Sequence, residues 1–182
     1  MADEATALGQ LMQLPNGAEV ADIGAGDGRF SVALSRHVGP GVRIIATELG
    51  RPNLLRLWKT ARRAGAGNVS VVEGAVSDTT LPAGSCDAIV LRRTYHHLMQ
   101  PTDMATSLFR TLRPGGRLLV IEQPLVRLKP LPSDVPAVRG GDGIMADVLI
   151  AELQAAGFRH ERTVDSFSRE LYLVVMRKPG GS

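Results

Sequence analysis

The sequence predicts an α/β fold: a doubly wound (Rossmann-like), mostly parallel seven-stranded sheet with an antiparallel last strand and helices on both faces. Two observations carry this prediction. Up to Ile121, short apolar segments typical of buried strands alternate with segments of helical spacing, as in a parallel sheet with helical crossovers. After Gly157, two strand-like segments follow each other with a short connection, so we expect them to pair antiparallel. The length of 182 residues suits a single domain over residues 1–182.

Each expected element has its own local pattern. Pro52 suits a first helical turn, and Gly157 suits a helix C-cap. The expected strands are Val20–Ile23, Val42–Thr47, Val69–Glu73, Ala88–Leu91, Leu118–Ile121, Arg159–Val164 and Leu171–Met176. The expected helices are Glu4–Leu14, Phe30–Val38, Pro52–Ala64, Thr102–Leu112 and Ile144–Ala156.

Three segments carry more specific expectations. The N-terminal helix lies within residues 1–16, before the breaker Pro15-Asn16-Gly17. Residues 125–143, rich in proline and glycine, are expected to form a long loop near the functional site. On the helix that begins at Pro52, Leu55 and Trp58 are expected to pack on the sheet. The basic residues of that helix are expected to form a solvated face: Arg56, Lys59, Arg62 and Arg63.

Composition excludes several classes of protein. Apolar residues make up 44% of the chain and charged residues 21%, which excludes a disordered chain. No apolar run approaches the ~18 residues of a membrane span, and the acidic start does not resemble a secretory signal, so we expect a cytoplasmic protein. Cys86 is the lone cysteine, and no metal site is expected. The net charge is +3, but the basic residues are scattered and aromatics are 4%, which disfavours a nucleic-acid partner.

The most informative segment is Asp22–Gly28, which reads DIGAGDG between an expected strand and an expected helix. A glycine-rich turn at this point lets a ligand approach the backbone closely, beside the free amides of the helix N-terminus. A dinucleotide site of the G-x-G-x-x-G type would need a glycine at position 29, where this chain has Arg29. The spacing therefore disfavours a nicotinamide cofactor.

The same segment resembles motif I of the class I S-adenosylmethionine-dependent methyltransferases. Residues 81–90, LPAGSCDAIV, and 112–118, LRPGGRL, are similar to that family's segments around its fourth and fifth strands. The antiparallel pair expected at the C-terminus also resembles the family's last strands. The resemblance implies that the cofactor is S-adenosylmethionine. It also implies that the following residues bind it: Asp22, Gly24, Ala25, Gly26, Gly28, Glu48, Leu49, Ala75, Val76 and Arg92.

The chemistry of that cofactor agrees with two of these residues. S-adenosylmethionine has an ammonium group, from which Asp22 can accept a hydrogen bond directly or through water. It also has ribose hydroxyls, from which an ionised Glu48 can accept hydrogen bonds. The family often has an acidic residue for the adenine amino group where this chain has Ala75. Either backbone groups around Ala75 and Val76 bind the adenine edge, or Asp78 does.

The acceptor of the methyl group is expected at the end of the fourth strand. There, His96 or His97 is the candidate base or orienting group, and Arg93 and Tyr95 are the candidate substrate contacts. The alternative is that one histidine only packs beneath the next helix. The Asn/Asp-Pro-Pro-Tyr signature of enzymes that methylate DNA bases is missing here, so we expect a small-molecule acceptor.

The predicted function is thus methyl transfer from S-adenosylmethionine to a small molecule, an in-line displacement driven mainly by proximity. One alternative is a non-catalytic S-adenosylmethionine-binding sensor or partner subunit. Another is a nicotinamide-dependent oxidoreductase, which Arg29 disfavours. The sequence leaves open the acceptor, the acceptor atom and whether the chain forms a homodimer.

Overall fold

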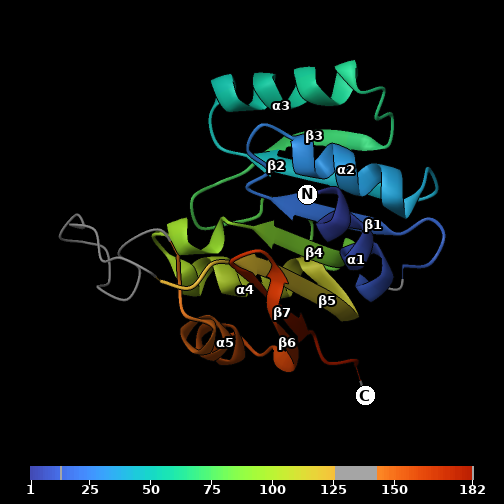
Figure 1. Cartoon of the computed structure of the whole chain (residues 1–182). Coiled ribbons are helices and arrows are strands. Elements are labelled where there is room, and N and C mark those ends of the chain that lie inside the picture. The colour runs from blue at the N-terminus through green and yellow to red at the C-terminus, as the bar shows by residue number, and fades with distance from the viewer. Residues whose placement is uncertain (13, 126–142, 182) are drawn as a thin grey trace.

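The computed structural model describes residues 1–12, 14–125 and 143–181, which form one sheet in the order β3-β2-β1-β4-β5-β7-β6 (Figure 1). The strands are β1 (Glu19–Ile23), β2 (Arg43–Glu48), β3 (Val69–Glu73), β4 (Cys86–Arg92), β5 (Leu112–Glu122), β6 (Arg159–Ser168) and β7 (Leu171–Arg177). The helices are α1 (Ala2–Met12), α2 (Arg29–Val38), α3 (Arg51–Arg63), α4 (Pro101–Thr111) and α5 (Ala146–Ala155), with a 3-10 helix, η1, at Tyr95–His97.

The strand directions confirm the predicted fold class. β1 to β5 pair in parallel, whereas β7 lies antiparallel between β5 and β6. Parallel neighbours need crossovers, and the helices between them supply these connections (Figure 1). No helix in the described ranges is both long and apolar enough to cross a membrane. Of the loop expected at 125–143, residues 126–142 lie outside the described residues.

Among the described residues, two apolar cores, one on each face of the sheet, hold α1, α2, α4 and α5. Side chains alternate between the faces along each strand, so Val20 joins the core under α1 and α2 while Ala21 joins the core under α4 and α5. Asp22 follows on the same face as Val20, and Arg92 lies on the same face as Val90 of β4. This alternation places both polar side chains on the α1 and α2 face.

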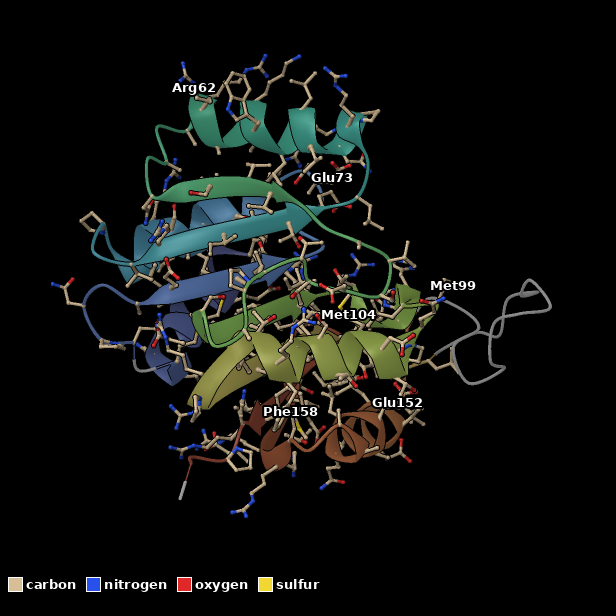
Figure 2. All side chains as sticks on the ribbon, turned by 180° about the vertical axis from the view of Figure 1, so that it is seen from behind. Arg62, Glu73, Met99, Met104, Glu152 and Phe158 are labelled. Atoms are coloured by element: carbon tan, nitrogen blue, oxygen red, sulfur yellow. The ribbon has the colours of Figure 1, made fainter. Side chains whose placement is uncertain are left out.

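Two expectations about local packing need correction. Leu55 and Trp58 do not pack on the sheet: 49% and 48% of their surfaces are exposed, and Leu57 and Ala61 are the buried residues of α3. The reason is helical phase, since positions four apart share a face. Trp58 instead lies beneath the guanidinium of Arg62, which projects from the outer side of α3 (Figure 2).

The fifth strand is longer than expected. β5 begins at Leu112, before the expected start at Leu118, because Leu112 pairs with Cys86. A register shift then precedes the pairing of Ala88 with Arg117. A bulge of this kind adds residues to one strand and leaves the pairing on either side intact. The carboxyl ends of β1, β2, β4 and β5 still meet at one edge, which is where ligands bind in sheets of this type.

Candidate functional site

A cavity of about 570 Å³ lies at the carboxyl ends of the strands. That volume is in the range of small-molecule sites, roughly 300–1,000 Å³. Most residues predicted to bind cofactor or acceptor line it: Asp22, Gly24, Ala25, Gly26, Glu48, Leu49, Ala75, Val76, Arg92, Arg93 and His97. Gly28, Tyr95 and His96 do not line it.

Asp22 presents a buried carboxyl to this cavity. The residue is 1% exposed, and its Oδ2 accepts the hydroxyl of Ser31 in α2 at 2.6 Å. Burial raises the pKa of Asp22 to about 6, an increase to which Glu48 adds, while the Ser31 hydrogen bond and the charge of Arg92 oppose it. A carboxylate held in this way has little solvation of its own and is suited to accept a ligand cation.

The glycines of the loop differ in their surroundings. A methyl group built on Gly26, where φ is +58°, would meet no atom within 4 Å. On Gly24 the same group would overlap the side chain of Thr94, and on Gly28 it would overlap that of Leu57. Gly24 and Gly28 therefore permit close packing within the protein, whereas Gly26 keeps space open in the cavity. Gly28 lies outside the cavity lining, where α2 packs against α3, and its expected contact with the cofactor stays a prediction.

Glu48, the last residue of β2, ties the loop to the neighbouring strand. Its Oε2 accepts the backbone N–H of Gly26 at 2.6 Å, and its Oε1 accepts the N–H of Leu49 at 2.8 Å. Each carboxylate oxygen has a further lone pair, so both stay able to accept hydroxyl groups of a ligand.

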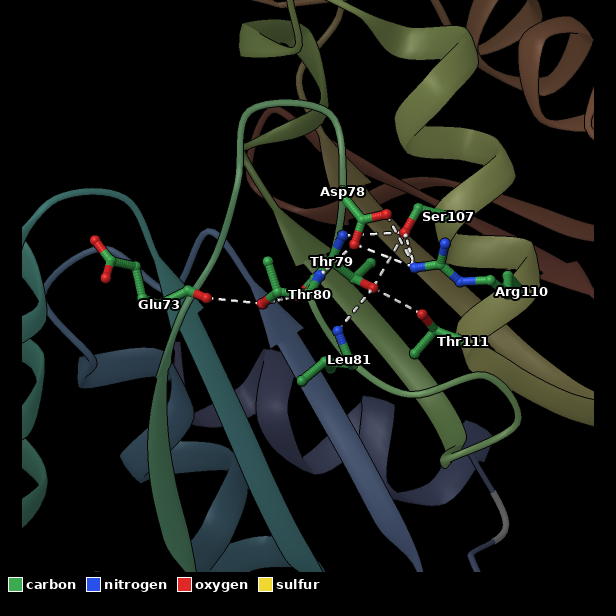
Figure 3. A network of polar contacts seen from close by, with 8 residues as sticks. All are labelled: Glu73, Asp78, Thr79, Thr80, Leu81, Ser107, Arg110 and Thr111. Carbon is green, nitrogen blue, oxygen red and sulfur yellow. Dashed lines mark hydrogen bonds and ion pairs between the residues drawn. The ribbon is translucent and has the colours of Figure 1, made fainter.

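The loop after β3 contains both candidates for binding the adenine edge, the backbone around Ala75 and Val76 and the side chain of Asp78. Ala75, Val76 and Asp78 all line the cavity. The carboxylate of Asp78, however, already accepts the N–H of Thr80 at 2.6 Å and a guanidinium N–H of Arg110 at 2.9 Å (Figure 3). Oδ1 of Asp78 also accepts from the same Arg110 nitrogen at 3.1 Å, so three of the four lone pairs of this carboxylate are used within the protein, against two for Glu48.

A buried hydroxyl cluster fixes the position of this loop. The Thr79 hydroxyl lies 2.7 Å from that of Thr111 and 3.2 Å from that of Ser107, both on α4 (Figure 3). The backbone N–H of Thr79 also donates to Ser107 at 3.0 Å. Together with the Asp78–Arg110 pair, these contacts hold the cavity wall against α4.

Arg92 joins the end of β4 to the N-terminal helix. Its Nε donates to Glu4 Oε2 at 2.6 Å and its Nη2 to Oε1 at 3.3 Å, while its guanidinium lies 5.5 Å from the centre of the Phe30 ring. Glu4 is only 4% exposed. Burial raises the pKa of Glu4, but hydrogen bonds from Arg92 and Ser168 outweigh it and hold that pKa below its usual value. Sequence reasoning missed Glu4, because nothing near it in the sequence indicates its partner.

The four residues predicted around the acceptor point in different directions. Arg93 has φ +54° and an exposed side chain that lines the cavity, as does the exposed His97. Tyr95 is instead fully buried, and its hydroxyl donates to Glu152 of α5 at 3.0 Å. His96 is also buried and bonded to a carboxylate. These side chains point in different directions because they lie in η1, a 3-10 helix, in which successive residues are rotated by about 120° around the helix axis. Tyr95 thus makes a core contact in this structure, and its expected contact with the substrate stays a prediction.

A family model described as a methyltransferase domain matches residues 21–120, which contain the glycine loop, Glu48 and the whole of β4. The chain belongs to this methyltransferase-domain family. Within the described residues, no group of three or more His, Cys, Asp or Glu side chains is placed to hold a metal ion.

Two curated proteins are similar to part of this chain. The ubiquinone/menaquinone biosynthesis C-methyltransferase UbiE of Pasteurella multocida is 31% identical over 117 residues, which cover 63% of this chain and 43% of that protein. The UbiE of Pseudomonas entomophila is 28% identical over 115 residues, which cover 62% of this chain and 44% of that protein. The chain thus spans less than half the length of these relatives.

Solved structures share the methyltransferase fold over nearly the whole chain. A SAM-dependent methyltransferase from Aquifex aeolicus has a TM-score of 0.78 at 24% identity, covering 95% of this chain and 88% of that one. The [4+2]-cyclase SpnF has a TM-score of 0.80 at 20% identity, covering 98% and 82%. At these identities the similarity is one of fold.

The wall of the cavity next to His97 is apolar, which the sequence analysis did not predict. Leu98 and Met104 are buried there, and the exposed Met1 and Met99 add their side chains to the lining. Met104 lies in the first turn of α4, and Met99 lies in the turn before that helix (Figure 2). Methionines scattered along a sequence give no periodic signal, so only the fold brings them together.

Proposed function

We propose that this chain transfers the methyl group of S-adenosylmethionine to a small-molecule acceptor. The observation that carries the proposal is that the carboxyls of Asp22 and Glu48 line one cavity together with Gly26. S-adenosylmethionine has an ammonium group and a ribose diol but no pyrophosphate. A site for it therefore needs two carboxylate acceptors and an open glycine, and membership of the methyltransferase-domain family supports the same cofactor.

Each part of the cofactor has matching groups. Asp22 would accept the ammonium, whose charge offsets the cost of ionising a buried carboxyl. Glu48 would accept the ribose hydroxyls while it retains the loop, and Leu49 would pack beside it. For the adenine edge we favour the backbone of Ala75 and Val76, because Asp78 is engaged by Arg110.

When bound, S-adenosylmethionine supplies a methyl group already activated by the sulfonium. The protein then has to hold the acceptor in line, and proximity alone provides much of the rate. Where the acceptor atom carries a proton, His97 is placed to take it, since its side chain lines the cavity and imidazole titrates near neutral pH. Arg93 is placed to bind an anionic or polar group of the acceptor.

The acceptor is proposed to carry an apolar portion. Leu98, Met99 and Met104 form an adaptable apolar wall beside His97, and Met1 adds a further apolar side chain to the cavity lining. A nucleic acid would need an aromatic or basic platform instead, and such residues are few or scattered here.

The test has two stages. Calorimetry should detect binding of S-adenosylmethionine and of its demethylated product to the wild-type chain. A labelled-methyl assay against a panel of hydroxylated, amino and enolisable small molecules, each with and without an apolar tail, should then detect transfer.

The control is Glu73→Gln, which changes an exposed carboxyl at the end of the neighbouring strand and should leave binding and transfer unchanged. If a folded protein bound neither the cofactor nor its product, the proposal would be wrong. Binding without transfer to any acceptor would instead favour a non-catalytic sensor or partner subunit.

A further inference from the structure

A buried carboxylate–imidazole pair lies behind the cavity. Glu122, the last residue of β5, is 0% exposed, and His96 in η1 is 7% exposed. Nδ1 of His96 lies 2.7 Å from Oε2 of Glu122, and the backbone N–H of His96 donates to Oε1 at 3.2 Å. Both oxygens of Glu122 are thus directed at one residue.

The pair fixes the tautomer of His96. An ionised carboxylate only accepts hydrogen bonds, so Nδ1 must carry the proton and Nε2 keeps the lone pair of the neutral ring. Titratable side chains on the surrounding elements include Tyr172 of β7, Asp147 and Glu152 of α5, Asp103 of α4, Arg92 at the end of β4, and Arg93 and His97 after it. Tyr172 pairs in register with Glu122, but its hydroxyl donates to the carbonyl of Ile144 at 2.7 Å.

The pair reaches the cavity through one ring contact. The rings of His96 and His97 have their centroids 3.9 Å apart at an interplanar angle of 46°. His97 lines the cavity and His96 does not. The negative charge of Glu122 is therefore one imidazole away from the group placed to take a proton from the acceptor.

We propose that Glu122 is a positioning residue for methyl transfer: through His96 it orients the ring of His97 and favours the protonated form of that ring. This inference rests on the proposed function. In the step concerned, the acceptor atom forms a bond to the methyl carbon as the sulfur–methyl bond breaks and sulfur keeps the electron pair. The acceptor proton passes to His97, so the positive charge lost at sulfur appears on the imidazole, where Glu122 stabilises it.

A purely structural role is the competing explanation. A buried glutamate that accepts a backbone N–H could serve only to hold η1 against β5. The two roles differ in one measurable property. A structural clamp leaves the proton affinity of His97 unchanged, whereas a charge acting through His96 raises it.

The first experiment is an NMR titration of the histidine ring signals, for which the four histidines of the chain are few enough to be assigned. In Glu122→Gln, the pKa of His97 should fall by about one unit, because the negative charge that acts on it through His96 is lost. The exposed His37 and His160 should titrate as in the wild type. The matched control is Glu161→Gln, a glutamate of β6 paired with Arg117 and Arg177, which should change neither cavity histidine. An unchanged His97 titration in folded Glu122→Gln would overturn the proposal.

A second measurement, the titration of the histidine ring signals in the wild-type protein, needs no Glu122 variant. The ring signals of His96 should shift in step with the titration of His97, because the two sites are coupled. If His96 signals stay constant while His97 titrates, the coupling is missing and the proposal is wrong, even if Glu122→Gln does not fold.

Measurements of kcat and of cofactor affinity in Glu122→Gln distinguish the role of Glu122 from the proposed function itself. Glu122→Gln should lower kcat by up to about tenfold, since one pKa unit is a tenfold change in proton affinity, and should move the acidic limb of the pH profile to lower pH. Cofactor affinity should stay unchanged. In a His97→Gln background the added Glu122→Gln should have no further effect, and an equal loss in both backgrounds would indicate a structural clamp. Should the wild type bind no cofactor, the proposed function fails and the titrations still decide whether Glu122 acts on His97.

Discussion

The carboxylate of Glu48 accepts the backbone N–H of Gly26 at 2.6 Å. This bond joins the end of β2 to the middle of the glycine loop that follows β1. The residue proposed to hold the ribose therefore also holds the loop that leaves room for the cofactor, so the two features of the site depend on each other.

The first prediction concerns Glu48→Gln. The amide keeps one acceptor oxygen where the carboxylate has two, so one of the N–H groups of Gly26 and Leu49 loses its partner and the hydrogen bonds to the ribose lose their charge. We expect the affinity for S-adenosylmethionine, measured by calorimetry, to fall by about 1–3 kcal/mol. Glu73→Gln, at the register partner of Glu48 on β3, is the control. Equal affinities of wild type and Glu48→Gln would show that Glu48 makes no contact with the cofactor.

The second prediction separates two glycines of the same loop. Gly26→Ala should cost only the left-handed backbone strain, about 1–2 kcal/mol of unfolding free energy, because its new methyl group meets no protein atom. That methyl group would occupy ligand space, so cofactor binding should be lost. Gly28→Ala should cost about 1–3 kcal/mol more, since its methyl group overlaps the fully buried Leu57.

Denaturant unfolding and calorimetry on both glycine variants check this. A Gly26→Ala protein that binds the cofactor as tightly as the wild type would mean that the loop lies away from the ligand. Similar stabilities of Gly26→Ala and Gly28→Ala would contradict the packing role of Gly28.

The third prediction concerns the pH dependence of Asp22, whose folded-state pKa of about 6 lies above the usual value of 3.8. A raised carboxyl pKa means that the unfolded state ionises first, so stability is present at low pH and is lost as pH rises through 6. The unfolding free energy of Asp22→Asn minus that of the wild type should therefore grow between pH 4 and pH 7.5, by about 2–3 kcal/mol. Because this is a difference between two pH values, other effects of the amide cancel.

Cofactor binding should show the opposite trend at the same residue. The ammonium requires an ionised Asp22, so wild-type affinity should weaken as pH falls below about 6. Asp22→Asn should bind weakly at every pH and lose this dependence. Affinity that is independent of pH between 5 and 8 in the wild type would argue against a contact between Asp22 and the ammonium.

The fourth prediction concerns the N-terminal helix. Glu4→Gln should lower the unfolding free energy at neutral pH by about 1–3 kcal/mol, because Arg92 then keeps its charge with only a neutral partner. The pKa of Glu4 is lowered in the folded protein, so this loss should vanish as pH falls and Glu4 becomes protonated. Thermal unfolding at pH 7 and at low pH measures it. Asp3→Asn, on the exposed side of the same helix, should leave stability unchanged.

Several features of the site were predictable from the sequence because they are local. The DIGAGDG segment, its position between a strand and a helix, and Glu48 at the end of the next strand are visible as short patterns. Parallel strands bring their carboxyl ends to one edge, so the convergence of Asp22 and Glu48 follows from the fold class alone.

Other features were not predictable, because they depend on contacts between distant parts of the chain. Glu4 and Arg92 are 88 positions apart, and Glu122 and His96 are 26 apart. No periodicity marks such pairs, and each could equally be a solvated charge. The same holds for α3, where a difference of one position, about 100° around the helix, separates the buried Leu57 from the exposed Trp58.

The sequence by itself thus determined the fold class, the glycine loop and the two acidic residues at the strand ends, since strand and helix periods and glycine spacing are properties of short segments. Only the tertiary structure decided which residues after β4 face the cavity. A 3-10 turn directs Tyr95 into the core, His96 to Glu122 and His97 to the cavity. A helix of three residues is too short to show hydrophobic periodicity in the sequence. The directions of its side chains are therefore set by packing against β5 and α5.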